Sequence, residues 1–521
     1  MSSGDRPTLQ LEVDGQQVEV VDRGGSLLDV LREELGLRSP KDGCSPQGQC
    51  GCCTVLVDGQ PRVACVTPAR RVAGRSITTV DGLPAATRGR WAGAFCATGA
   101  SQCGFCTPGI VCRLEGLSAK GTAPDDHAAV EQALLAHLCR CTGWRTILDA
   151  WDLATGGGEI PSRPLDGATA RATLEGGVAQ AVDPGVALGQ GGFADDTAPR
   201  DALVALPDGA GGWVVGESLA EARALAGKVQ GRRTTVDAAP PLDLPPGEWA
   251  ATLRTSWVEP AYLEPDASWC EPGGTPRTPL ANGGAFGGKV SSPVTAAARE
   301  LADLHGRTVR VLLDREDVVR LGPKRPPVAG GAAADGTGLL RVVRTDGIAA
   351  AIASVAPQLV VEEVDVPGPP TTMSVRAAGW AEAVVLLAGV QGLAGPVHDP
   401  ATGAIAEAEI TPQGEVRVRV RAGDPLDEVV LRSYCTGAAH MALSWMSSEG
   451  IAVDDTGTPH DLTIRSFGVL RAVDTPAIHI EIEPDVGPPV RASDAVFAAV
   501  AAAAWLHAGC PTDWPTGTRW R

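Results

Sequence analysis

GCSPQGQCGCC (residues 43–53) decides the fold, because it places four of the chain's fourteen cysteines within a short glycine-rich loop. Eleven of the fourteen lie between positions 44 and 141, and the other three are Cys270, Cys435 and Cys510. In a reducing compartment, cysteines crowded in this way bind metal more often than they form disulfides. The crowding therefore predicts metal sites in the first part of the chain.

The spacing divides these cysteines into two sets of four. The first set, Cys44-x5-Cys50-x2-Cys53-x11-Cys65, is close to the spacing that holds a [2Fe–2S] cluster in plant-type ferredoxins. The second combines Cys103-x2-Cys106 with Cys139-x-Cys141. Four cysteines also suit Zn²⁺, but the C-x-C pair departs from the CxxC…CxxC pattern of structural zinc sites. We therefore expect two [2Fe–2S] clusters, with the ligands Cys44, Cys50, Cys53, Cys65, Cys103, Cys106, Cys139 and Cys141.

The sequence around the first set predicts a β-grasp ferredoxin domain over residues 1–82. Residues 9–21 and 54–66 each alternate apolar and polar side chains around an Asp-Gly turn, as β-hairpins do. Ser26 precedes a helical apolar period over residues 26–37 and is placed to cap that helix.

Beyond the first domain, the apolar period predicts an all-α domain over residues 83–153. Residues 109–117 and 125–138 have a helical pattern and stand between the two cysteine pairs of the second set. Residues 154–166 are rich in Gly, Pro and Ser and are typical of a linker. Residues 167–521 alternate Val-rich strands (415–423, 463–470 and 477–483) with Ala-rich helices, which indicates an α+β fold.

Two motifs carry a resemblance to a known family. QCGFCTPGIV (102–111) and LCRCTGWRTI (138–147) resemble the iron–sulfur subunit of the xanthine dehydrogenase and aldehyde oxidase family of molybdenum hydroxylases. The resemblance implies that Gln102 contacts the pterin of a molybdenum cofactor, whereas the alternative is a surface glutamine at a helix end. The family has four residues between its first two ligands and this chain has five, and it has a small residue where this chain has Cys52. Cys52 is therefore expected to be a bystander, and Cys96 and Cys112 to be buried small apolar residues.

Later segments resemble the molybdenum-binding subunit of the same family. NGGAFGGK (282–289) resembles its glycine-rich loop beside the metal, which implies that Gly284, Phe286 and Gly287 lie on the pterin side. From the residues alone, such a loop is either an anion cradle at a helix start or a tight turn. VRAAGWAE (375–382) resembles the turn that contributes an active-site arginine, so Arg376 is either a binder of an anionic group or a relic on the surface.

The resemblance breaks down at the expected general base. The family uses a glutamate in a Gly-Glu-Pro-Pro turn, and the corresponding residues 485–489 are DVGPP. A hydroxylase needs a carboxylate to deprotonate its oxygen nucleophile, and the nearby candidates are Glu483 and Asp485. The chain is also too short for a full molybdenum subunit. The resemblance thus implies a shortened molybdopterin-binding domain, and we expect the isolated chain to lack hydroxylase activity.

The sequence as a whole predicts an electron-transfer subunit of a molybdenum hydroxylase. The resemblance implies a molybdopterin-binding partner and an FAD-binding partner, with electrons passing through both clusters to a flavin. The alternatives are a compact hydroxylase of aldehydes or N-heterocycles that binds molybdopterin itself, and a non-catalytic assembly module. The net charge of −18 argues against nucleic acid or an anionic membrane as partner. With neither a leader nor a long apolar run, a cytoplasmic protein is expected.

Overall fold

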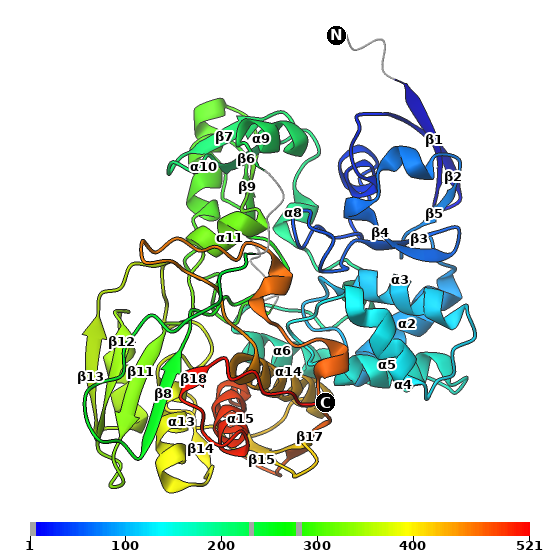
Figure 1. Ribbon diagram of the computed structural model, residues 1–521. Coiled ribbons are helices and arrows are strands. Elements are labelled where there is room, and N and C mark those ends of the chain that lie inside the picture. The colour runs from blue at the N-terminus through cyan, green and yellow to red at the C-terminus, as the bar shows by residue number, and fades with distance from the viewer. Residues whose placement is uncertain (1–6, 229–233, 278–283) are drawn as a thin grey trace.

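The computed structural model describes residues 7–228, 234–277 and 284–521, and it places the two amino-terminal domains alongside a larger α+β region (Figure 1). The first domain is built on a five-stranded sheet in the order β2-β1-β5-β3-β4. Both predicted hairpins are present, and the strands are β1 (Thr8–Val13), β2 (Gln16–Val21), β3 (Thr54–Val57), β4 (Gln60–Val63) and β5 (Ser76–Thr78). Alternate residues of β1 point into the core, as the period of two predicted.

The helix expected over residues 26–37 is shorter and wider than predicted. Ser26 does cap it, because its hydroxyl accepts a hydrogen bond from Asp29 N, but the α-helix α1 covers only Leu27–Asp29. It continues as a π-helix, η1 (Val30–Glu34). Arg32 lies in this wider turn and is buried, with its guanidinium bonded to Asp195 from the third region. A helical period reports only the spacing of nearby residues, so it could not predict this tertiary contact or the wider turn.

The second domain consists of helices, as predicted. They are α2 (Ala85–Thr98), α3 (Thr107–Ser118), α4 (His127–Ala133), the 3-10 turn η4 (Leu134–Ala136) and α5 (Arg145–Thr155). Trp91 of α2 and Trp151 of α5 pack with ring centroids 6.1 Å apart and anchor the core. Cys103 and Cys106 precede α3, and Cys139 and Cys141 lie between η4 and α5.

The third region contains three sheets with helices packed against them, which confirms its α+β class. The first sheet, β7-β6-β10-β9, comprises β6 (Leu203–Pro207), β7 (Trp213–Gly216), β9 (Ala267–Cys270) and β10 (Val309–Leu312), and is packed by α9 (Leu219–Leu225) and α10 (Val294–His305). The second, β13-β12-β11-β8-β18, comprises β8 (Ala251–Thr255), β11 (Val328–Ala332), β12 (Gly338–Val343), β13 (Leu359–Val364) and β18 (Asp513–Trp514). The third, β14-β15-β16-β17, comprises β14 (Val397–His398), β15 (Ile405–Ile410), β16 (Val416–Arg421) and β17 (Ile478–Ile482).

The remaining helices cover these sheets and fill the space between them. They are α6 (Asp166–Gly176), α7 (Pro184–Ala187), α8 (Ala194–Thr197), α11 (Arg315–Leu321), α12 (Ile348–Val355), α13 (Trp380–Gln391), α14 (Glu428–Ser447) and α15 (Ser493–His507). The last two are buried over most of their length and pack against each other. No helix in the described parts of the chain is long and apolar enough to span a bilayer.

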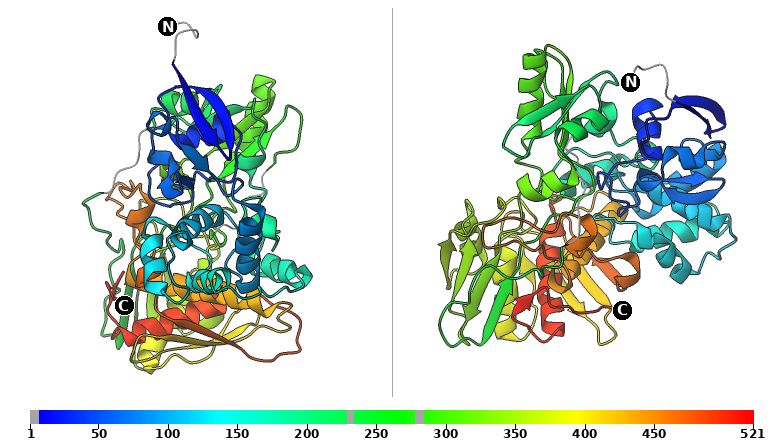
Figure 2. Two further views of the ribbon diagram at one scale, coloured as in Figure 1. Left: turned by 90° about the vertical axis from the view of Figure 1, so that its right-hand side faces the viewer. Right: turned by 45° about the horizontal axis from the view of Figure 1, so that its top comes forward.

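One predicted strand is wrong. Residues 463–470 form a 3-10 turn, η5 (Ile464–Phe467), followed by Gly468 at φ 81°. The two apolar residues of this turn, Ile464 and Phe467, are three positions apart and both enter the core shared with the first two domains, which suits a 3-10 turn better than a strand. In Figures 1 and 2 this orange segment runs between the third region and the two amino-terminal domains.

Candidate functional site

The first cysteine set is gathered in the interior of the first domain. Cys44, Cys50, Cys53 and Cys65 are all buried. The Cys44 thiol contacts those of Cys50 and Cys65, and these contacts hold the pKa of Cys44 well below its usual value and raise those of its neighbours. Backbone groups also point at sulfur: Gln47 N donates to Cys44 Sγ at 3.2 Å, and Cys65 N donates to Cys53 Sγ at 3.4 Å. The loop therefore offers converging thiols and N–H donors.

The second set is assembled from the start of α3 and the loop before α5. The sulfurs of Cys103 and Cys141 are 3.7 Å apart, and Cys106 contacts Cys139. This contact, aided by Thr142, lowers the pKa of Cys139 to about 6. Four buried thiols therefore meet here as well.

Both sets fit a two-iron cluster. Among residues 7–228, 234–277 and 284–521, no three His, Cys, Asp or Glu side chains are gathered closely enough to hold a single metal ion. The thiols of the second set lie in two contacting pairs, whereas in the first set Cys44 contacts both Cys50 and Cys65. Each set therefore offers the four neighbouring cysteines that a [2Fe–2S] cluster requires.

The two sets are joined by direct backbone contact. Leu138 N donates to the carbonyl oxygen of Cys50 at 3.0 Å, so the residue next to Cys139 is bonded to a member of the first set. Gly51, at φ 72°, is pressed against the same segment: a Cβ there would lie 2.5 Å from the His137 ring and 2.6 Å from Ala136 O. Only glycine permits this approach.

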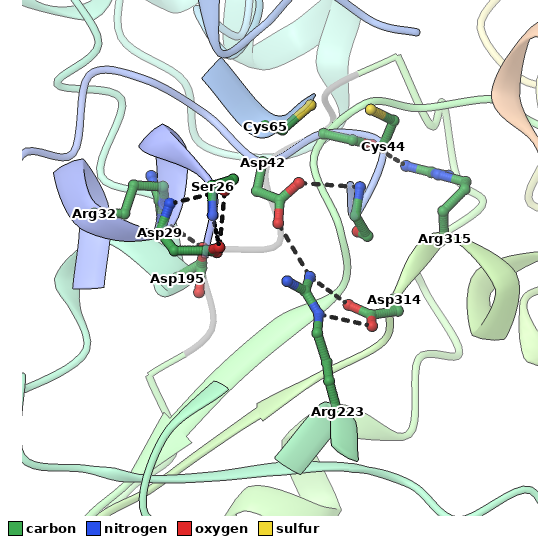
Figure 3. A network of polar contacts seen from close by, with 12 residues as sticks. Ser26, Asp29, Arg32, Asp42, Cys44, Cys65, Asp195, Arg223, Asp314 and Arg315 are labelled. Atoms are coloured by element: carbon green, nitrogen blue, oxygen red, sulfur yellow. Dashed lines mark hydrogen bonds and ion pairs between the residues drawn. The ribbon is translucent and has the colours of Figure 1, made fainter. Parts of the chain in front are cut away.

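An ionic network from the third region fixes the first cysteine loop (Figure 3). Asp42 accepts hydrogen bonds from Ser45 N at 3.0 Å and from Arg223 of α9, which also pairs with Asp314. Burial raises the pKa of Asp42 to about 6. The fully buried Arg315 donates to Gly43 O at 3.1 Å. The loop beside Cys44 is thus held from far along the chain.

The second loop is held by a buried ion pair that the sequence did not reveal. Arg140, between Cys139 and Cys141, pairs with Glu449, and Arg140 Nη2 lies 2.7 Å from Glu449 Oε2. The two side chains are 2% and 1% exposed. Arg140 Nε also donates to Pro260 O at 3.0 Å. Because the partners are far apart in sequence, no local motif signals the pair.

Gln102 is buried, so the surface alternative is wrong. Its side-chain amide donates to Cys141 O and to Ser433 Oγ of α14, both at 3.0 Å. The amide therefore links the second cysteine loop to α14 and is occupied by protein partners. Gln102 does not line the cavity described next.

A cavity of about 760 Å³ lies beside the glycine-rich loop. Its lining includes Phe286, Gly287 and Arg376, three of the residues that the resemblance implicates. Arg376 is 2% exposed, which rules out the surface interpretation, and its guanidinium lies 3.6 Å from the centroid of the Phe286 ring. Burial lowers the pKa of Arg376 to about 10. Gly284 lies elsewhere, packed against Arg140, while residues 282–283 of the loop fall outside the described residues.

The carboxylates expected to replace the missing glutamate are not in the cavity. Glu483 accepts a hydrogen bond from Arg421 at 2.8 Å, and Asp485 accepts one from Gly487 N at 2.9 Å. Neither lines the cavity, whose acidic residues are Glu175, Asp399 and Asp494.

Asp494 is the carboxylate that sequence reasoning missed. Its Oδ1 lies 3.4 Å from Arg376 Nε, and a position in the first turn of α15 was its only available signal. The residues that the resemblance implies for pterin contact and proton transfer therefore do not converge on this cavity, so the described residues do not fit a complete molybdopterin site.

Comparison with known proteins yields two family models and several relatives of the amino-terminal part. Residues 11–76 match the 2Fe-2S iron-sulfur cluster binding domain, and residues 79–152 match the [2Fe-2S] binding domain. The iron-sulfur-binding subunit of xanthine dehydrogenase from Escherichia coli is 35% identical over 153 residues, covering 29% of this chain and 94% of that protein. The nicotine 6-hydroxylase small subunit of Paenarthrobacter nicotinovorans is 39% identical over 150 residues, covering 29% and 90%.

Structural comparison extends the similarity to the rest of the chain. The aldehyde oxidoreductase of Desulfovibrio desulfuricans superposes with a TM-score of 0.70, covering 96% of this chain and 97% of that one. The sequence identity is 15%, so this match concerns the fold alone.

Proposed function

Since this chain belongs to the xanthine dehydrogenase and aldehyde oxidase family of molybdenum hydroxylases, we propose that it is an electron-transfer subunit of such an enzyme. It would accept electrons from a molybdenum centre in a partner subunit and pass them to a flavin or another acceptor. The clusters would be held by Cys44, Cys50, Cys53, Cys65, Cys103, Cys106, Cys139 and Cys141. A [2Fe–2S] cluster bound by these thiolates supplies a one-electron carrier whose potential depends on hydrogen bonding and burial.

The contact between the two thiol sets carries this proposal. The Leu138–Cys50 hydrogen bond joins the two loops at their cysteines. Its acceptor is the carbonyl oxygen of Cys50, and its donor is the backbone N–H of the residue that precedes Cys139, so the path from one ligand to the other consists of a few covalent bonds and this single hydrogen bond. Gly51 allows the backbones to touch, so no solvent layer separates them. Burial of all eight thiols keeps water away from the metal and limits the rearrangement that accompanies a change of charge.

The domain boundaries form part of the same proposal. We assign residues 1–82 to the ferredoxin-like domain, 83–153 to the helical domain, 154–166 to a linker and 167–521 to a shortened molybdopterin-domain-like scaffold. The scaffold role is supported by the partners that it supplies: Arg223 and Arg315 hold the first cysteine loop, and Glu449 holds the second.

A compact hydroxylase is the second candidate, and the cavity favours it. Its volume suits a small organic ligand, and Asp399 Oδ2 in its wall is buried without a hydrogen-bond partner. Against this candidate, Glu483 and Asp485 lie outside the cavity, and Asp494 in its wall is paired with Arg376, so no free carboxylate is established as a base for an aldehyde or N-heterocycle.

Metal content distinguishes the two candidates. The chain is purified anaerobically from a host that makes molybdenum cofactor, and iron and molybdenum are measured by plasma mass spectrometry. We expect about four irons per chain from two [2Fe–2S] clusters, without molybdenum. About one molybdenum per chain would refute the subunit proposal and favour the compact enzyme. Iron near zero would refute both.

A further inference from the structure

Val66 lies on the surface of the first domain, directly after the last thiol of the first set. It is 53% exposed, and its side chain lies against the turn at Gly48, where a Cβ would be 2.8 Å from Val66 Cγ1. The preceding Cys65 is 5% exposed, whereas the other three thiols of the set are 1% exposed. The first thiol set is therefore closest to solvent at Cys65.

The segment around Val66 is basic, although the chain as a whole is acidic. Residues 59–80 contain four arginines and no Asp or Glu, in a chain whose net charge is −18. Arg62, Arg70 and Arg71 are exposed, and none of them has a carboxylate partner among the residues that the structure describes. The fourth arginine is paired with an aspartate. Three free positive charges thus lie within a few residues of Val66.

Another exposed arginine reaches the same turn from the third region. Arg465 Nε donates to Gln49 O at 3.0 Å, and the backbone N–H of Arg465 donates to Gln49 Oε1 at 3.1 Å. Because Gln49 follows Gly48, Arg465 and Val66 border the same turn of the first cysteine loop. We call the surface formed by Gly48, Arg62, Val66, Arg70, Arg71 and Arg465 the Val66 face.

The charge of the Val66 face selects the kind of partner that it fits. An acidic protein is repelled by most of an acidic chain and is steered toward a local group of free arginines. An apolar centre with a charged rim is also how protein interfaces are built. A nucleic acid would present phosphates to the exposed valine and would be repelled by the rest of the chain. The face therefore suits an acidic protein.

We propose that the Val66 face is the docking site of the electron acceptor, a flavin-carrying protein with an acidic contact surface. One electron leaves the reduced first cluster beside Cys65, which returns that cluster to its oxidised state, and the acceptor gains this electron. The inference rests on the proposed function, because it requires a cluster held by the first thiol set.

The test is the reoxidation of the reduced full chain by two one-electron oxidants of opposite charge. Hexacyanoferrate(III), a trianion, stands in for an acidic acceptor, and tris(phenanthroline)cobalt(III) is a trication. Stopped-flow absorbance follows the colour of the clusters at low and at high salt. Iron is counted in every sample, so loss of a cluster is separated from a change in rate.

The variants reverse two charges at each of two places. Arg70→Glu/Arg71→Glu changes the Val66 face. Arg417→Glu/Arg419→Glu is the matched control, because these side chains are 58% and 56% exposed on β16. Their sheet lies at the end of the molecule opposite β1 and β2 (Figure 1).

We expect the variant of the Val66 face to react about tenfold more slowly with the trianion at low salt, and faster with the trication. The difference should disappear at 1 M salt, where charges are screened beyond about 3 Å. The control should keep the wild-type rate constants. An unchanged rate with the trianion, or an equal loss in the control, would overturn the inference. So would binding of duplex DNA that only the variant of the Val66 face loses, with unchanged oxidation rates, because the face would then bind nucleic acid. A wild-type chain without iron would instead refute the proposed function itself.

Discussion

Replacing Glu449 by glutamine should destabilise the second cysteine loop, although Glu449 lies far from that loop in the sequence. The substitution keeps the shape of the side chain but removes its charge, so the buried Arg140 guanidinium is left with neutral acceptors only, the introduced amide oxygen and Pro260 O at 3.0 Å. Removing one member of a buried ion pair costs about 3–5 kcal/mol. Because Arg140 stands between Cys139 and Cys141, the cost falls on the loop that supplies half of the second thiol set.

Chemical denaturation and iron counting test this expectation. Glu449→Gln should unfold at a clearly lower denaturant concentration and should lose iron toward two per chain when challenged with a chelator. Glu362→Gln is the matched control, because its pair with Arg341 is exposed (47% and 26%) and is worth about 1 kcal/mol or less. If Glu449→Gln kept the wild-type midpoint and all of its iron, the third region would not be holding this loop.

Three further perturbations address the loops and the buried core. Gly51→Ala should abolish the first cluster and leave about two irons per chain, since its Cβ would collide with the His137 ring at 2.5 Å; a full complement of iron would contradict the close approach. His440 is buried and its pKa is lowered to about 3 from 6.5. The unfolded chain therefore binds this proton at a higher pH than the folded chain, and stability should fall as the pH drops below about 6.5. His440→Asn should reduce that slope in denaturation at pH 4 to 7, to which the buried His137, whose pKa is also lowered to about 3, contributes as well; an unchanged slope would exclude His440 as a source. Arg465→Ala removes the side-chain hydrogen bonds to Gln49 O at 3.0 Å and to Leu135 O, and should speed loss of the first cluster to a chelator; equal rates would count against this contact.

Local patterns predicted what depends on local chemistry. The hairpins of the first domain and the helices of the second follow from periods of two and 3.6 residues, and both were confirmed. The spacing divided the cysteines into two sets, but it could not show how the second set is assembled, because its contacts join the start of α3 to the loop before α5. The Ser26 cap was also predictable, since the Ser and Asp residues that form it are three positions apart.

The sequence could not reveal interactions between distant segments. The buried Arg32 lies in a π-helix, and its partner, the half-buried Asp195, is 163 residues away; Arg140 and Glu449 are 309 residues apart. Residues 463–470 were wrongly predicted to form a strand, because the positions of Ile464 and Phe467 are set by packing against a core that the first two domains contribute. Arg376 and Gln102 were given surface alternatives for the same reason, since only the assembled fold shows what covers them.

These distant contacts also explain why the third region is tied so closely to the first two domains. Arg32 and Lys41 of the first domain are buried, and both form ion pairs with Asp196; Arg140 of the second is buried and pairs with Glu449. A buried cation without its partner costs several kcal/mol, a large part of the net stability of a domain. Residues 167–521 therefore stabilise the amino-terminal domains whether or not the cavity beside Arg376 binds a ligand. The two amino-terminal domains and residues 167–521 are therefore joined by buried ion pairs as well as by the shared apolar core.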